Sequence, residues 1–181
     1  GKVYQGYQNT LRSKTEWMNG IKVVRVWSYM TANKGFAKRI LDFISYSITP
    51  FFAGLFQSCD IIVATSPQFF TALSGRTLHW FKRKPWIMEV RDLWPDSIKA
   101  VGAMKGNIVL DYFSKEEKWC YQSADKIIVV TNSFKKDIIK KGIPAKKIHV
   151  VKNGANAELF KPSEKSQALL DRYHLNGKKI L

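Results

Sequence analysis

Short apolar runs that alternate with helix-like stretches are the feature that most constrains the fold of this chain. Five runs rich in β-branched residues predict strands: Ile21–Trp27, Asp60–Ser66, Pro85–Val90, Lys126–Thr131 and Lys147–Val151. The runs are continuous rather than alternating in polarity, which is typical of strands covered on both faces. The pattern therefore predicts an α/β fold, a parallel sheet with helices on both faces.

The stretches between these runs predict four helices: Phe36–Phe56, Pro67–Lys82, Asn107–Gln122 and a segment capped by Asn132 or Ser133 that ends before Gly142. We expect Pro50 to kink the first helix and Ser66 to cap the second. The charged stretches Lys115–Trp119 and Phe134–Lys141 predict solvated faces of amphipathic helices.

Ligands of parallel α/β sheets bind beyond the carboxyl ends of the strands. Four predicted loops should lie along that edge: Thr65–Pro67, Arg91–Asp96, Thr131–Ser133 and Lys152–Asn156. Ser66, Asn132 and Ser133 belong to predicted helix N-termini, so they are caps first and candidate anion or sugar contacts second. Asn153 and Gly154 form a strong turn signal and are candidate substrate contacts as well.

The segment Arg91–Asp96 has the densest chemistry of the four loops. Arg91 offers a guanidinium fork for a phosphate or carboxylate. Asp92 could orient an acceptor hydroxyl or accept its proton. Trp94 could present a flat face to a sugar ring, and Asp96 could pair with Arg91. In the alternative interpretation, Asp92 caps the turn and Trp94 packs over a stiff loop, and the sequence leaves both open.

The formal net charge of +16 is spread along the chain. It favours a broad basic surface that faces a polyanion, such as nucleic acid, an anionic membrane or phosphorylated substrates. In Leu78–Trp86, aromatic and cationic residues are interleaved, which suits a bilayer headgroup region. The candidate membrane contacts are Trp80, Phe81, Lys82, Arg83, Lys84 and Trp86. The alternative is an ordinary solvated helix end with a few core aromatics.

Several common site motifs are absent from the sequence. It contains no GxGxxG, GxxxxGK[ST], GxSxG or DxD. Its histidines are too scattered to suggest a metal site, and its two cysteines, Cys59 and Cys120, are interpreted as buried free thiols. We therefore expect neither a metal nor a cofactor.

The succession "DIIVATSP", "EVRDLWPDSI", "KEEKWCYQSADKIIVVTNSFKKDI" and "IHVVKNGANAELFKP" resembles the N-terminal, Rossmann-like domain of family 4 glycosyltransferases with the GT-B fold. The resemblance runs from about Ile21 onward. The form "RDLWP" is similar to bacterial transferases of O-antigen and capsule assembly that add an N-acetylated aminosugar, such as N-acetyl-L-fucosamine.

The resemblance implies transfer of a sugar from a nucleotide donor with retention and without an essential metal. The acceptor would be a polyprenyl-pyrophosphate-linked sugar at the inner face of the plasma membrane, where the enzyme is peripheral. The loop at the end of the "EVRD" strand would carry Arg91 and Asp92 as catalytic residues, although many relatives have His there.

The resemblance also predicts a domain organisation. Residues 1–160 would form the acceptor-binding domain, and residues 161–181 a linker and the start of a donor-binding domain. We expect a first strand with its glycine-rich loop before Gly1, and the rest of the donor domain after Leu181. The isolated chain would then be inactive.

Two other functions stay open from the sequence alone. The first is a basic nucleic-acid-binding α/β module, which the charge permits but no base-reading motif supports. The second is an enzyme resembling a sugar-nucleotide epimerase. Among the anionic partners that the positive charge allows, we expect a nucleotide sugar and an anionic membrane, and no nucleic acid.

Overall fold

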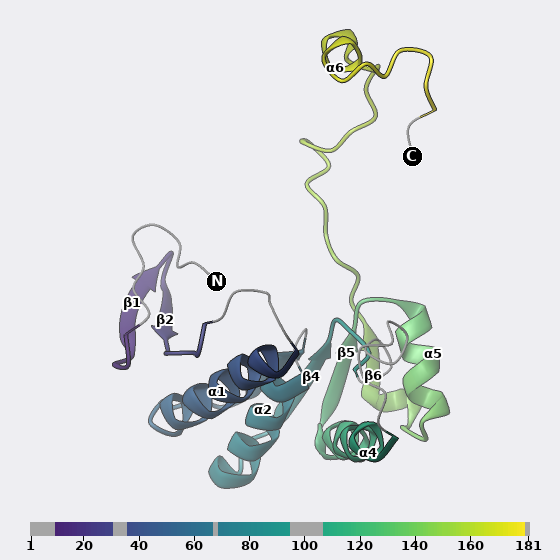
Figure 1. The fold of residues 1–181 in the computed structure, drawn as a ribbon. Helices are drawn as coiled ribbons and strands as arrows, with labels where there is room; N and C mark the ends of the chain where they lie inside the picture. The colour runs from purple at the N-terminus through teal and green to yellow at the C-terminus, as the bar shows by residue number, and fades with distance from the viewer. Residues whose placement is uncertain (1–9, 31–35, 67–68, 95–106, 180–181) are drawn as a thin grey trace.

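The computed structural model describes residues 10–30, 36–66, 69–94 and 107–179 of the protein. Its centre is a four-stranded parallel sheet in the order β3-β4-β5-β6 (Figure 1). The strands are β3 (Ile62–Ser66), β4 (Trp86–Val90), β5 (Lys126–Val129) and β6 (Ile148–Val150). The predicted α/β class is confirmed, and four of the five predicted strands lie in this sheet.

The four strands end in one row of the sheet. Ser66 pairs with Val90, Val90 with Val129, and Val129 with Val150. Because the strands are parallel, their carboxyl ends lie at the same edge. The loops that follow them therefore begin side by side.

The predicted helices are confirmed to within a few residues where the structure describes them. They are α1 (Phe36–Leu55), α2 (Phe69–Lys82), α4 (Asn107–Ser123) and α5 (Asn132–Lys140). Two short elements complete the described chain, the 3₁₀ helix η1 (Ala145–Lys147) and α6 (Gln167–Arg172). None of the helices in these ranges combines the length and hydropathy needed to cross a bilayer.

The strand predicted at Ile21–Trp27 is not part of the parallel sheet. It is β2 (Ile21–Arg25), which pairs antiparallel with β1 (Lys14–Met18) in a separate hairpin. Asn19 and Gly20 form the turn with φ angles of 50° and 80°. Positive φ at both central residues is the requirement of the tight turns that Asn-Gly favours. The dipeptide therefore signalled a hairpin rather than a strand of the main sheet.

The two faces of the parallel sheet are covered unequally. In β4, Trp86, Met88 and Val90 are buried, whereas Ile87 and Glu89 are half-buried. In β3, Val63 on the less covered face is 57% exposed. Because each strand lies beside the next in chain order, right-handed connections place α2, α4 and α5 on one face. The side chains of the continuous apolar runs thus lie on two faces of the sheet, one deeply buried and one only partly covered.

Helix α2 lies unusually close to the sheet at Gly75. A Cβ atom added there would stand 2.4 Å from the Cβ of Ala64 in β3. No real Cβ contact is that short, so the approach depends on the absence of a side chain on α2.

The solvated face predicted at Lys115–Trp119 is correct for Lys115, Lys118 and Trp119, which are exposed, and wrong for the two carboxylates Glu116 and Glu117, which are buried. Glu117 accepts hydrogen bonds from Lys141 Nζ (2.7 Å) and from the Tyr121 hydroxyl (2.8 Å). Glu116 pairs with Arg76 of α2 at 3.1 Å. Because α4 meets cations from neighbours on both sides, these charges are buried with partners.

Beyond β6 the chain leaves the sheet. Residues 151–169 are exposed throughout, and Figure 1 shows the segment extending away from the helices and strands to α6. The predicted boundary between residues 160 and 161 falls in this segment and stays a prediction.

Breaking the pair between Glu117 and Lys141 should destabilise the fold strongly. Removing the cation in Lys141→Ala leaves a buried carboxylate without this partner, so we expect a loss of roughly 3 kcal/mol in the free energy of unfolding. The neighbouring Lys140 makes an exposed pair with Asp137, so Lys140→Ala should cost less than about 1 kcal/mol. Urea denaturation of both variants measures the difference, and equal losses would contradict this role.

Candidate functional site

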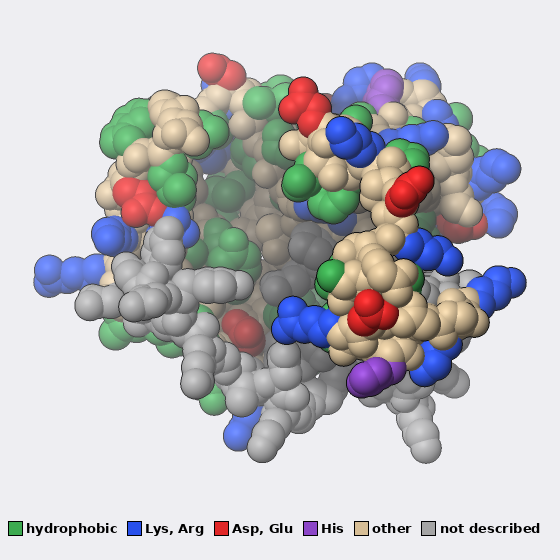
Figure 2. Space-filling model, turned by 90° about the horizontal axis from the view of Figure 1, so that it is seen from above, with side chains coloured by type: hydrophobic (Ala, Val, Ile, Leu, Met, Phe, Trp, Pro, Cys, Tyr) green, Lys and Arg blue, Asp and Glu red, His purple; other side chains and the backbone are tan. Residues whose placement is uncertain are grey.

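The carboxyl edge of the sheet is the candidate functional site. Two backbone hydrogen bonds continue the pairing one step past the strands, from Arg91 N to Ser66 O (3.2 Å) and from Val151 N to Val129 O (2.9 Å). The described parts of the four predicted loops therefore start along one edge, as predicted. Figure 2 looks at the molecule from above. On the visible face, Lys and Arg side chains are more frequent than Asp and Glu side chains.

Arg91 and Asp92 directly follow β4, which lies between β3 and β5 inside the sheet. The side chain of Arg91 is exposed, and that of Asp92 is half-buried. A guanidinium in this position can meet an anion at the edge, and a carboxylate beside it can accept a proton or a hydrogen bond. Asp96, the expected partner of Arg91, lies outside the described residues.

Trp94 belongs to the aromatic core. It is 8% exposed, and its ring stacks on Phe69 with centroids 6.1 Å apart and planes 6° apart. Phe70 and Phe113 meet it edge-on at 6.2 Å and 5.9 Å. The open face that we expected for a sugar ring is not seen, because core aromatics cover it. Of the two interpretations left open by the sequence, packing of the loop fits these contacts.

The predicted polar residues at the helix starts differ in exposure. Ser66 ends β3 and is buried, whereas Asn132 and Ser133 begin α5 and are exposed. The cap of α5 is neither of the two predicted residues. It is Thr131, whose Oγ1 accepts a hydrogen bond from Phe134 N at 3.1 Å. Asn132 and Ser133 thus occupy the first turn, where backbone N–H groups lack helical partners.

Asn153 and Gly154 are exposed in an extended segment, not in the turn that we predicted. The turn comes later, where Asn156 Oδ1 accepts hydrogen bonds from Glu158 N (3.0 Å) and Leu159 N (3.2 Å). The side chain of Asn156 stabilises this turn. The Asn-Gly signal therefore identified the region of the turn but not the residue that forms it. The substrate contacts of Asn153 and Gly154 stay predictions.

Glu89 is a candidate that sequence reasoning missed. It lies one residue before the end of β4, and its Oε2 accepts a hydrogen bond from Thr65 Oγ1 of β3 at 2.6 Å. Both side chains are half-buried on the less covered face of the sheet. The available signal was a single carboxylate within an otherwise apolar run.

The described residues include no group of three or more His, Cys, Asp or Glu that could hold a metal ion. Independence from metals and cofactors stays a prediction. Burial raises the pKa of the Cys120 thiol to about 12, so this group is inert at neutral pH. Cys59 is half-buried rather than buried as predicted, and both thiols are free.

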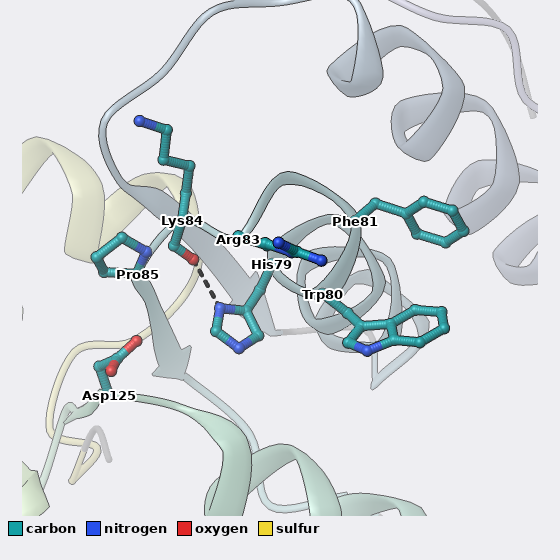
Figure 3. Close-up of a pocket in the computed structure, with 7 residues that line it drawn as sticks. All are labelled: His79, Trp80, Phe81, Arg83, Lys84, Pro85 and Asp125. Atoms are coloured by element: carbon teal, nitrogen blue, oxygen red, sulfur yellow. Dashed lines mark hydrogen bonds between the residues drawn. The ribbon is translucent and has the colours of Figure 1, made fainter.

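A hollow of about 580 Å³ lies at the opposite edge, where β4 and β5 begin. Its lining includes His79, Arg83, Lys84, Pro85 and Asp125 (Figure 3). His79 Nδ1 and Lys84 O lie 2.6 Å apart, and Asp125 Oδ2 accepts a hydrogen bond from Trp86 N at 2.8 Å. These polar groups hold the start of β4 in place, and the hollow is separate from the candidate site.

The predicted membrane contacts divide into two groups. Trp80, Phe81 and Arg83 are exposed. Trp86 is fully buried in the core, so its prediction as a surface contact is wrong. Lys82 is half-buried and donates to Leu55 O and Gln57 O at the end of α1, while Lys84 Nζ lies 4.0 Å from Asp60 Oδ1.

The family model of Glycosyltransferase Family 4 matches residues 11–159, which include every described strand and the candidate site. The chain belongs to glycosyltransferase family 4. Membership confirms the predicted activity class, a glycosyltransferase, and agrees with a Rossmann-like half of a GT-B fold. No curated protein matches the chain.

Trp94 and Arg91 should respond differently to truncation in this family 4 domain. Trp94→Ala removes a buried ring and should lower the free energy of unfolding by about 3–5 kcal/mol. Arg91→Ala removes an exposed side chain and should change it by less than about 0.5 kcal/mol. Chemical denaturation measures both, and a stable Trp94→Ala variant would reopen a role for this ring in binding.

Proposed function

We propose that this chain is the acceptor-binding side of a retaining glycosyltransferase that transfers an N-acetylated aminosugar from a UDP donor to a polyprenyl-pyrophosphate-linked sugar. The pathway would be bacterial O-antigen or capsule synthesis. One observation carries the site assignment: Arg91 and Asp92 come together where an inner strand of the sheet ends, with the guanidinium exposed. The proposal of a hexosyl-type aminosugar transferase rests further on the "RDLWP" form of this loop.

The two side chains have complementary roles in the proposed reaction. An acceptor hydroxyl attacks the anomeric carbon of the donor while the bond to the leaving phosphate breaks. Asp92 orients that hydroxyl or accepts its proton. Arg91 pairs with phosphate oxygens through its planar fork and stabilises their negative charge. Asn132 and Ser133, in the first turn of α5, offer backbone N–H groups to an anion at the same edge.

The basic surface supports substrates that carry phosphate. The chain has a formal net charge of +16, and both a UDP-sugar and a polyprenyl pyrophosphate are anions. A field of one sign raises the local concentration of such substrates and the rate of their encounter. The prenyl chain anchors the acceptor in a bilayer, so we place the enzyme as a peripheral protein at the inner face of the plasma membrane.

Sugar transfer by the protein made from its complete gene tests the proposal. Asp92→Asn and Arg91→Ala should each lower turnover by about a hundredfold or more, because each removes a group that acts on the reacting atoms. The assay supplies UDP-N-acetyl aminosugars and a polyprenyl-pyrophosphate-linked sugar, and measures the glycosylated lipid.

The matched controls are Asp137→Asn and Lys140→Ala, which remove an exposed pair on α5. They change the same kinds of charge without touching the edge, so their turnover should equal that of the parent. Full turnover in both site variants would remove Arg91 and Asp92 from the reaction. Transfer of an unacetylated hexose alone would overturn the aminosugar assignment.

A further inference from the structure

Helix α1 has an apolar stripe that the described part of the chain leaves exposed. Its members follow at intervals of three or four residues and therefore share one face of the helix: Leu41, Ile44, Ile48, Phe52 and, just past the helix end, Phe56. Phe52 is 55% exposed and Phe56 is 85% exposed. The other side of α1 packs toward α2, where the rings of Phe43 and Phe70 lie 6.3 Å apart. The stripe thus takes no part in the core.

A chain of aromatic rings connects this stripe to the end of α2. Phe51 lies 5.2 Å from Phe52 and 5.5 Å from Phe81, and Phe81 lies 5.2 Å from Trp80. Figure 3 shows Phe81 directed toward the neighbouring helix and Trp80 directed away from Pro85 and Asp125. Trp80 is 73% exposed. We name the stripe together with Trp80 and Phe81 the aromatic face.

A lysine holds the two helix ends that form this face. Lys82 Nζ donates hydrogen bonds to Leu55 O (3.0 Å) and to Gln57 O (2.7 Å). Because carbonyl groups at a helix end lack helical partners, the ammonium satisfies them and fixes the end of α1 to α2. The aromatic face is therefore a preformed surface rather than two independent segments.

Charge at the border of the face selects its partner. The exposed cations Lys38, one turn before Leu41, and Arg83, next to the aromatic pair, flank the apolar surface. Asp42 is the acid of α1 and is half-buried. A helix with an apolar stripe, bulky aromatics at its end and cations beside them matches the interface of an anionic bilayer.

We propose that the aromatic face docks this protein on an anionic lipid surface, with α1 lying in the membrane plane. The stripe from Leu41 to Phe56 is about 22 Å long at helical rise, and such a surface needs no shape-matched groove in its partner. The proposal deepens the proposed function, because it names the surface that meets the bilayer of the acceptor.

Vesicle flotation tests this docking surface without any sugar transfer. The probe is a phosphatidylcholine vesicle with or without phosphatidylglycerol. The parent chain should float with the anionic vesicles. Phe52→Ser combined with Phe56→Ser should lower the partition coefficient at least about tenfold, because two exposed rings no longer enter the lipid.

The matched control is Leu159→Ser combined with Phe160→Ser, two side chains that are 71% and 73% exposed on the segment after β6. This variant loses as much exposed apolar surface at a distance from the aromatic face and should float like the parent. Circular dichroism checks that both variants fold. If the first variant does not fold, Trp80→Ser replaces it, since that ring is exposed and should also lower flotation.

A charge reversal separates lipid charge from apolar contact. Arg83→Glu should weaken flotation with phosphatidylglycerol vesicles by about fivefold or more, since one basic side chain near such a surface contributes about 1 kcal/mol. Lys161→Glu, on the exposed segment, is the matched control.

Three outcomes would overturn the proposal: no flotation of the parent at low salt, equal flotation of the Phe52/Phe56 variant, or a dimer in size-exclusion chromatography that this variant alone dissociates. The last result would assign the face to a second copy of the chain. Normal flotation without sugar transfer would count against the proposed function and leave the docking surface intact.

Discussion

The in-register parallel pairing of β3 to β6 determines where polar chemistry can stand in this protein. All four strands end in one row, so every following loop starts at the same edge. At the other edge, Asp125 joins β4 to β5 by accepting from Trp86 N and donating its own N–H to Trp86 O. Burial of one face requires apolar side chains there, so charge on that face starts only where the strands stop, and Glu89, the carboxylate inside β4, lies on the less covered face. The abrupt change from the apolar Val90 to the charged Arg91 marks the end of β4.

Ion pairs fix the positions of the helices over this sheet. Apolar contacts alone would specify these positions less well. Arg76 of α2 meets Glu116, and Lys141 after α5 meets Glu117, so α4 is bound from both sides. Buried pairs of this kind contribute little net energy when compared with apolar side chains, but a mismatched arrangement would leave a charge unpaired. The pairs therefore favour one lateral placement of α4. In this placement the ring of Phe113, on α4, contacts Trp94 and orients the start of the candidate loop.

The sequence predicted most of the fold, because apolar periodicity is a local property that both strands and helices display. The failures share a cause in tertiary structure. Glu117 and Trp86 look like surface residues in their own segments, and only their neighbours from other elements bury them. Three consecutive residues after β5 can all cap a helix, so local chemistry could not choose Thr131. In the candidate site, the position of Arg91 and Asp92 followed from topology, whereas Trp94 depended on rings contributed by α2 and α4.

The close approach of α2 to β3 shows a compromise between local and global stability. Glycine is among the poorest helix formers, with a cost near 1 kcal/mol relative to alanine inside a helix. Here the missing Cβ atom, which makes glycine a poor helix former, is also what allows α2 to approach Ala64 closely. A substitution at Gly75 that improves the isolated helix would lift α2 from the sheet, and with it Phe69 and Phe70 at the start of the helix. The distance between α2 and β3 is thus set by a residue without a side chain, Gly75, facing the single methyl group of Ala64.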